Sequence, residues 1–192
     1  MPESDIPNSP PELPALEIEW SDRQSRHALA PERFVDAARR ILSEAGVRAG
    51  SLSLAVVDDD QMHRLNRRHL DHDWPTDVLS FLLDEDESGE RIEGEVIVSA
   101  DYASREALEY GWRLEDELLL YVVHGTLHLI GHDDHEDEDR VAMRQAEARV
   151  LAAFGLVPRW AADEPGRGDL PSADIATRAV PMPPAEREER DR

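Results

Sequence analysis

The segment from Leu118 to Ile130, LLLYVVHGTLHLI, constrains the fold more strongly than any other part of the chain. Helical periodicity extends over residues 114–130, and nearly every side of this helix is apolar. A surface helix has a polar face, whereas a helix that is hydrophobic all round has to be buried. The sequence therefore predicts a central, buried helix.

The elements around this helix predict a small mixed sheet. Period-two alternation indicates strands, and apolar stripes of helical period with start and stop residues indicate helices. The expected strands cover residues 15–20, 51–57, 77–83 and 94–100, and the expected helices cover 31–46, 60–70, 101–111, 114–130 and 136–154. A strand, helix and strand followed by two further strands favour a small mixed sheet.

The two ends of the chain differ in composition from the part between them. Residues 1–14 are acidic and rich in proline, and after Pro158 the periodicity gives way to Pro, Gly, Ala and charged residues. Such segments bury too little apolar surface to fold. We therefore expect one domain at residues 15–158, which suits a chain of 192 residues, between disordered tails at 1–14 and 159–192.

The chain is strongly acidic, with 43 Asp and Glu residues, 21 basic residues and a formal net charge of -22. Such a surface repels nucleic acid and anionic membranes at low ionic strength. All of the basic residues are arginine. A salt-rich cytoplasm, where charges are screened over about 3 Å near 1 M salt, would account for the acidic surface. A high-GC genome would account only for the missing lysine.

The chain has no apolar run that approaches the roughly 18 residues needed to span a membrane. Its N-terminal segment also has no apolar stretch of the kind found in secretion signals. We therefore expect a soluble, cytoplasmic protein without a membrane partner.

Four of the eight histidines lie between His124 and His135, in the sequence HGTLHLIGHDDH. His124 and His128 are about 40° apart around a helix, so their rings leave the same face. The chain has no cysteine, so a metal here has to be held by imidazole, carboxylate and water. Two hydrogen-bonded core histidines are the simpler alternative, but the glycine and the ligand-type residues that follow favour a metal site.

The third ligand is expected in the turn after the helix. Gly131 ends the helix and lets the chain turn back toward the histidines. The spacing H-x3-H-x2-G-x2-D, which begins at His124 and ends at Asp134, matches the third-ligand position of metzincin-type zinc sites. Asp134 is therefore the first candidate, and His135, a softer donor that suits zinc, is the second. Both choices predict one Zn²⁺ with water in an open coordination position.

The residue after the first histidine is Gly125. Zinc peptidases of the H-E-x-x-H kind have a glutamate here that acts as general base, so a peptidase is disfavoured. A metal still lowers the pKa of a bound water toward 7. This water is the only catalytic group that the sequence assigns.

Three segments, HGTLHLIGHDD, LNRRHLDHDWPTDVLSF and GEVIVSADYA, resemble the YbeY family of bacterial metal-dependent endoribonucleases. The resemblance covers about residues 15–156, and the motifs occur in the family's order and spacing. It implies an α+β domain in which a short mixed sheet packs against helices, with zinc at the end of the central helix. It also implies cleavage of single-stranded RNA in 16S rRNA 3′-end processing and ribosome quality control.

The sequence departs from the family pattern at three positions. Asp134 takes the place of the third histidine ligand, and Glu95 replaces the aspartate of the second strand motif. Leu70 aligns with the family's arginine before the P-T-D segment. Arginine is well suited to contact a phosphate, so Arg67 or Arg68 on the same predicted helix becomes the candidate phosphate contact.

These features favour a zinc-dependent endoribonuclease, a hydrolase whose partners are single-stranded rRNA and the ribosome rather than DNA. The main alternative is a ribosome-associated binding factor with a structural metal, which Leu70 and the acidic charge favour. A zinc peptidase comes last. An open coordination position would indicate the enzyme, whereas a closed four-ligand site with both Asp134 and His135 would indicate the structural role.

Overall fold

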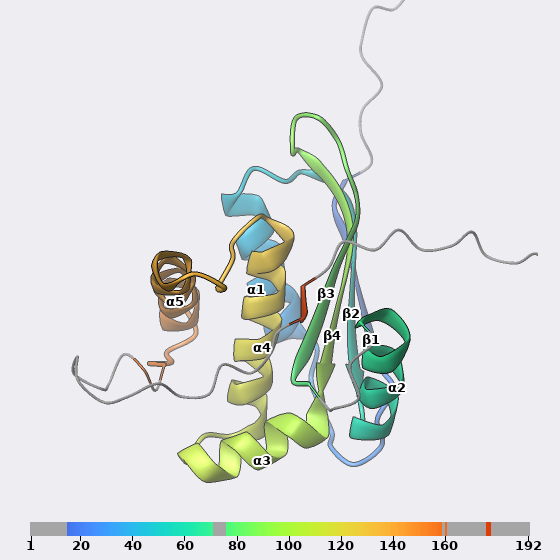
Figure 1. Cartoon of the computed structure of the whole chain (residues 1–192), viewed down its shortest axis with the longest axis vertical. Coiled ribbons are helices and arrows are strands. Elements are labelled where there is room, and N and C mark those ends of the chain that lie inside the picture. The colour runs from blue at the N-terminus through green and yellow to red at the C-terminus, as the bar shows by residue number, and fades with distance from the viewer. Residues whose placement is uncertain (1–14, 71–75, 159, 161–175, 178–192) are drawn as a thin grey trace, which may run out of the picture.

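The structure is a computed structural model that describes residues 15–70, 76–158, 160 and 176–177. In this part of the chain, one sheet contains β1 (Glu17–Asp22), β2 (Ala49–Val57), β3 (Val78–Glu85), β4 (Arg91–Ser99) and β5 (Ala176–Thr177). The helices are α1 (Glu32–Glu44), α2 (Asp59–Leu70), α3 (Ala100–Tyr110), α4 (Leu114–Leu129) and α5 (Asp137–Ala152). The predicted strands and helices are all present, so the expected α+β fold is confirmed (Figure 1).

The sheet is mixed, as the sequence predicts. Its strand order is β1-β2-β4-β3-β5. β1, β2 and β4 run parallel to one another, β3 is antiparallel to β4, and the short β5 is parallel to β3. Parallel neighbours need a crossover connection, and α1 supplies it between β1 and β2.

The hairpin of β3 and β4 is longer than expected. The sequence predicts an acidic loop between residues 83 and 94, but β3 continues to Glu85 and β4 begins at Arg91. The Arg91 guanidinium stabilises this extension, because it binds Asp84 at 2.6 Å and also contacts Glu93. Gly89 forms part of the turn with a φ of +71°, a conformation that residues with side chains rarely adopt.

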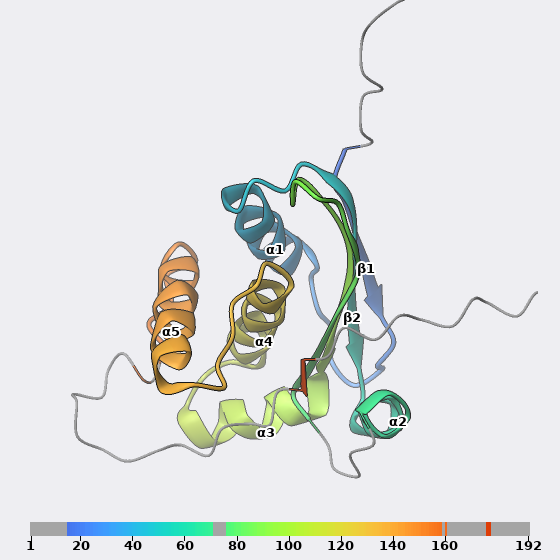
Figure 2. The same ribbon diagram turned by 45° about the horizontal axis from the view of Figure 1, so that its top comes forward.

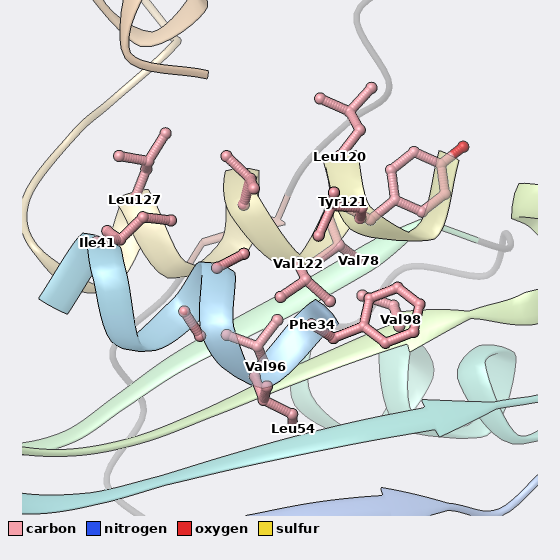
Figure 3. Packing of buried hydrophobic residues seen from close by; sticks show 14 of the residues in the cluster. Phe34, Ile41, Leu54, Val78, Val96, Val98, Leu120, Tyr121, Val122 and Leu127 are labelled. Carbon is pink, nitrogen blue, oxygen red and sulfur yellow. The ribbon is translucent and has the colours of Figure 1, made fainter. Parts of the chain in front are cut away.

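Helices cover both faces of the sheet, but unequally (Figures 1 and 2). α1 and α4 lie on one face, and α5 packs on the side of α4 that is turned away from the sheet. The main core lies between α1, α4 and the sheet, where Phe34, Leu54 and Val96 are completely buried (Figure 3). On the opposite face, α2 covers a smaller apolar cluster that includes Met62 and Phe81.

α4 is the central helix that the sequence predicts. Every residue from Glu117 to Leu129 is buried, because the sheet, α1, α3 and α5 surround the helix. After the helix ends, Gly131 has a φ of +89° and turns the chain back. The last two turns of α4 therefore lie inside the domain, and these turns contain His124 and His128.

Some predictions concern parts of the chain that the structure does not describe. Of the expected disordered tails, at 1–14 and 159–192, only residues 160 and 176–177 are described. The side chain of Leu70 and residues 71–75 also lie outside the described residues. Within the described part, none of the helices is both long and apolar enough to cross a membrane.

Candidate metal centre

The last two turns of α4 bring His124 and His128 together. Both residues are buried, with 7 % and 8 % of their surface exposed. Their ring centroids are 4.6 Å apart, and their Nε2 atoms are 2.8 Å apart. The four-residue spacing thus places two nitrogen donors next to each other inside the protein, as helix geometry predicts.

Asp134 joins these histidines from the turn that follows α4. Its Oδ1 lies 3.8 Å from Nε2 of His128, and its Oδ2 lies 3.9 Å from Nε2 of His124. One potential ligand atom from each residue lies within 4.8 Å of the other two. His124, His128 and Asp134 form what we call the HHD triad.

Hydrogen bonds hold the turn that carries Asp134. The His132 amide donates to the Leu127 carbonyl at 3.1 Å, and the His132 carbonyl accepts a hydrogen bond from Nδ1 of His128 at 2.8 Å. From α5, the Arg140 guanidinium donates to the Asp134 carbonyl at 3.4 Å. The turn is therefore fixed to the end of α4 on one side and to α5 on the other.

The outer nitrogens of the two rings determine which protons the inner nitrogens carry. A backbone carbonyl can only accept, so Nδ1 of His128 carries a hydrogen and Nε2 of the neutral ring has a lone pair. Nδ1 of His124 lies 2.6 Å from Oε1 of Glu147, and a carboxylate accepts in the same way. Two lone pairs then face each other at 2.8 Å, which is repulsive unless a proton or a metal ion intervenes. The HHD triad therefore fits a cation.

The electrostatic surroundings favour positive charge as well. Burial lowers the pKa of His124, but the hydrogen bond and charge of Glu147 outweigh burial, so the net effect is a raised pKa. Asp134 and Asp77 act in the same direction. Burial, together with the charge on His124, lowers the pKa of His128 to about 4. His128 is thus a neutral donor near neutral pH, beside carboxylates that stabilise a cation.

Gly125, next to His124 in the sequence, faces the sheet. A Cβ atom at this position would lie 2.7 Å from both Ser80 Oγ and Val96 Cγ1, closer than real side chains approach their neighbours. Because Gly125 has no side chain, α4 packs directly against β3 and β4 at this position. A glutamate general base does not fit here without displacing the sheet, which agrees with the low rank given to a peptidase.

The other predicted site residues lie apart from this arrangement. The His135 side chain is 66 % exposed, and its Nε2 lies 3.6 Å from Asp133 Oδ1. His135 groups with Asp133 and Asp134 in a second, more exposed cluster, not with the buried histidines. Arg67 and Arg68 are exposed on α2, which lies across the sheet from α4 (Figure 2).

Sequence reasoning missed Glu147, which contacts His124 from α5. Glu147 lies on the buried stripe of this helix with Met143, Ala146, Val150 and Leu151. A glutamate within an otherwise apolar stripe is the signal that identifies such a residue, because buried carboxylates almost always have a partner.

Comparison with known proteins places the chain in a family. A family model described as Endoribonuclease YbeY matches residues 19–155. The curated protein Endoribonuclease YbeY of Carboxydothermus hydrogenoformans is 44 % identical over 115 residues, which are 60 % of this chain and 79 % of the relative. The protein of the same name from Salinibacter ruber is 42 % identical over 157 residues, which are 78 % of this chain and 98 % of the relative.

A solved structure shares the fold. The solution structure of TM1509 from Thermotoga maritima matches with a TM-score of 0.52 and 24 % identity, over 79 % of this chain and 99 % of that one. At this identity the match supports the fold alone. The family model covers most of the described domain, and the Salinibacter ruber relative matches over nearly its whole length. The chain therefore belongs to the endoribonuclease YbeY family, as its motifs predict.

Proposed function

We propose that this chain is a metal-dependent endoribonuclease that cleaves single-stranded RNA in 16S rRNA 3′-end maturation and ribosome quality control. Membership of the endoribonuclease YbeY family supports RNA cleavage. The observation that carries the metal dependence is the HHD triad, in which two buried imidazole nitrogens and a carboxylate converge. Its proposed partners are rRNA and the ribosome, and its proposed location is the cytoplasm.

The proposed metal is one zinc ion held by His124, His128 and Asp134. Zinc binds imidazole and carboxylate donors, and catalytic zinc sites use three protein ligands and leave the fourth position open. His124, His128 and Asp134 are three ligands of the types found in such sites. When bound, zinc supplies positive charge that lowers the pKa of a water and offsets the charge of a phosphate.

The residues of the chain then act mainly by binding and orienting. His124 and His128 supply buried nitrogen donors whose outer nitrogens are fixed by hydrogen bonds. Asp134 adds a negative charge from a turn that is held at both sides. Contact with an RNA phosphate away from the HHD triad is proposed for Arg67 or Arg68, which are exposed on α2 across the sheet from α4.

RNA cleavage by three purified proteins tests this function: the wild type, His128→Ala and His135→Ala. Each would be incubated with a labelled single-stranded RNA and with its duplex, with and without chelator, from low salt to about 1 M KCl. His135→Ala is the matched control, because it removes a nearby exposed histidine that lies outside the HHD triad. We expect the wild type and His135→Ala to cleave the single strand, and we expect chelator or His128→Ala to abolish cleavage.

Two results would contradict this function. Equal cleavage by all three proteins, with or without chelator, would indicate a contaminating nuclease. Zinc binding without cleavage at any salt concentration would instead favour the ribosome-associated binding factor with a structural metal. Retention of activity near molar salt would support a high-salt cytoplasm as the reason for the acidic charge.

A further inference from the structure

The two histidines of the HHD triad are oriented by acceptors of different origin. His128 donates from Nδ1 to the carbonyl of His132, which belongs to the turn that follows its own helix. His124 meets a side chain from a separate helix, since Glu147 of α5 lies 2.6 Å from its Nδ1. The orientation of His124 therefore depends on how α5 packs against α4.

The position of Glu147 is unusual for a charged residue. Glu147 is 4 % exposed and shares the buried stripe of α5 with apolar residues. A carboxylate is costly to bury unless a hydrogen bond or a positive charge compensates for the lost water. His124 supplies this hydrogen bond, and a cation on the other side of the imidazole ring would supply the charge.

We propose that Glu147 is a positioning residue for the metal, which keeps the Nδ1 hydrogen on His124 and so leaves Nε2 as a donor. The proposal rests on the metal site proposed for the HHD triad. Carboxylate acceptors behind metal-bound histidines fix the tautomer and raise the basicity of the ligand, and their loss weakens metal binding by about 10- to 100-fold. Glu147 acts through His124 and has no direct contact with substrate in this role.

This arrangement couples the metal to the packing of α5. Anything that binds only the folded arrangement stabilises it by mass action, so zinc should hold α5 more firmly against α4. Arg140, near the start of α5, also donates to the carbonyl of Asp134. α5 therefore supports two of the three proposed ligands: His124 through Glu147, and the turn of Asp134 through Arg140.

Four variants separate the parts of this proposal. Glu147→Ala removes both the acceptor and the charge, whereas Glu147→Gln retains an acceptor oxygen but removes the charge. Glu147→Asp retains the charge on a shorter side chain. Met143→Ala is the matched control, because Met143 is fully buried on the same stripe one turn earlier and its loss weakens α5 packing without removing the acceptor of His124.

Zinc affinity of the chelator-treated proteins, measured by competition with a chromophoric chelator, is the main measurement. We expect the dissociation constant to rise by about 10- to 100-fold in Glu147→Ala, and by less in Glu147→Gln and Glu147→Asp. We expect no change in Met143→Ala despite its lower thermal stability. A protected Nδ1 proton of His124, seen in ¹H–¹⁵N spectra of the zinc-bound wild type and Met143→Ala, should be absent from Glu147→Ala.

The outcomes separate this proposal from the metal site itself. If the wild type binds zinc and Glu147→Ala binds it equally well, the positioning role is wrong while the metal site stands. An equal loss of affinity in Met143→Ala would also overturn the role, since packing alone would then explain the effect. If the wild type binds no zinc, both proposals fail. Should Glu147→Ala not fold, Glu147→Gln has a side chain of nearly the same size and still tests the charge of Glu147; zinc affinity equal to that of the wild type would then overturn the role of that charge.

Discussion

His128 and His135 belong to one short segment, yet their surroundings are opposite. The His128 side chain is 2 % exposed, its Nδ1 donates to a carbonyl, and its Nε2 faces His124. The His135 side chain is 66 % exposed, beside a carboxylate of the same turn. The comparison shows that an imidazole becomes a good candidate ligand when burial and a hydrogen bond on its outer nitrogen fix which nitrogen is available.

The largest difference between the two histidines should appear in stabilisation by zinc. For the wild type, zinc at about 100 times its dissociation constant should add about 2.7 kcal/mol to the free energy of unfolding, measured by thermal denaturation. His135→Ala should show the same increase, and His128→Ala should show none. An increase in His128→Ala equal to that of the wild type would place the zinc elsewhere in the chain.

The choice of third ligand sharpens the same comparison. Loss of a hydrogen-bond partner behind a metal ligand weakens metal binding by about 10- to 100-fold. Asp134→Ala removes a direct ligand, so it should weaken zinc binding by about 100-fold or more. Asp134→His should retain zinc, since imidazole is also a zinc donor. The zinc affinity of these variants and of His135→Ala, measured by isothermal titration calorimetry, would identify the third ligand. A loss of affinity in His135→Ala with no loss in Asp134→Ala would make His135 the ligand.

Gly125→Ala tests the close packing of α4 against the sheet, which buries His128 but does not reach His135. Adding a methyl group in Gly125→Ala should lower the free energy of unfolding by about 1–3 kcal/mol, because the new carbon meets Ser80 and Val96. Helix propensity alone predicts the opposite sign, a gain of up to about 1 kcal/mol. Urea denaturation of the wild type and Gly125→Ala measures the difference in their free energies of unfolding. A stabilised Gly125→Ala would show that α4 and the sheet are not in close contact here.

The smallest expected effect concerns residues remote from the HHD triad. Arg67→Ala or Arg68→Ala should leave folding and zinc affinity unchanged, because both side chains are exposed on α2. Each phosphate contact that is lost should reduce the salt dependence of RNA binding, expressed as a log–log slope, by about 1. Binding measured by fluorescence anisotropy at several KCl concentrations tests this. Unchanged slopes in both variants would assign the phosphate contact to other residues.

Much of the fold could be predicted from local patterns. The apolar run from Leu118 to Ile130 predicts a central helix, and the structure buries that helix on all sides. The extension of the β3 and β4 hairpin was not predicted, because its residues are acidic. Arg91 of β4 binds Asp84 of β3, a contact that forms only when the two strands meet.

The candidate site was predictable only where its residues lie close together in the sequence. His124, His128 and Asp134 follow from helix spacing and a glycine turn, and the structure brings them together. Glu147 was missed because α5 folds back over α4, a contact that no local spacing encodes. From the sequence, Gly125 indicates only that the glutamate of a zinc peptidase is missing. The structure explains the glycine itself, because the helix approaches the sheet closely at this position.

X-ray absorption at the zinc edge, on the wild type loaded with zinc, tests the central claim most directly. The claim is that one zinc ion is bound by the imidazoles of His124 and His128 and by the carboxylate of Asp134. In protein loaded with one zinc per chain, the spectrum should show two imidazole nitrogens at about 2.0–2.1 Å and oxygen donors in the remaining positions. A third imidazole, or a shell of oxygen atoms without imidazole, would contradict the claim.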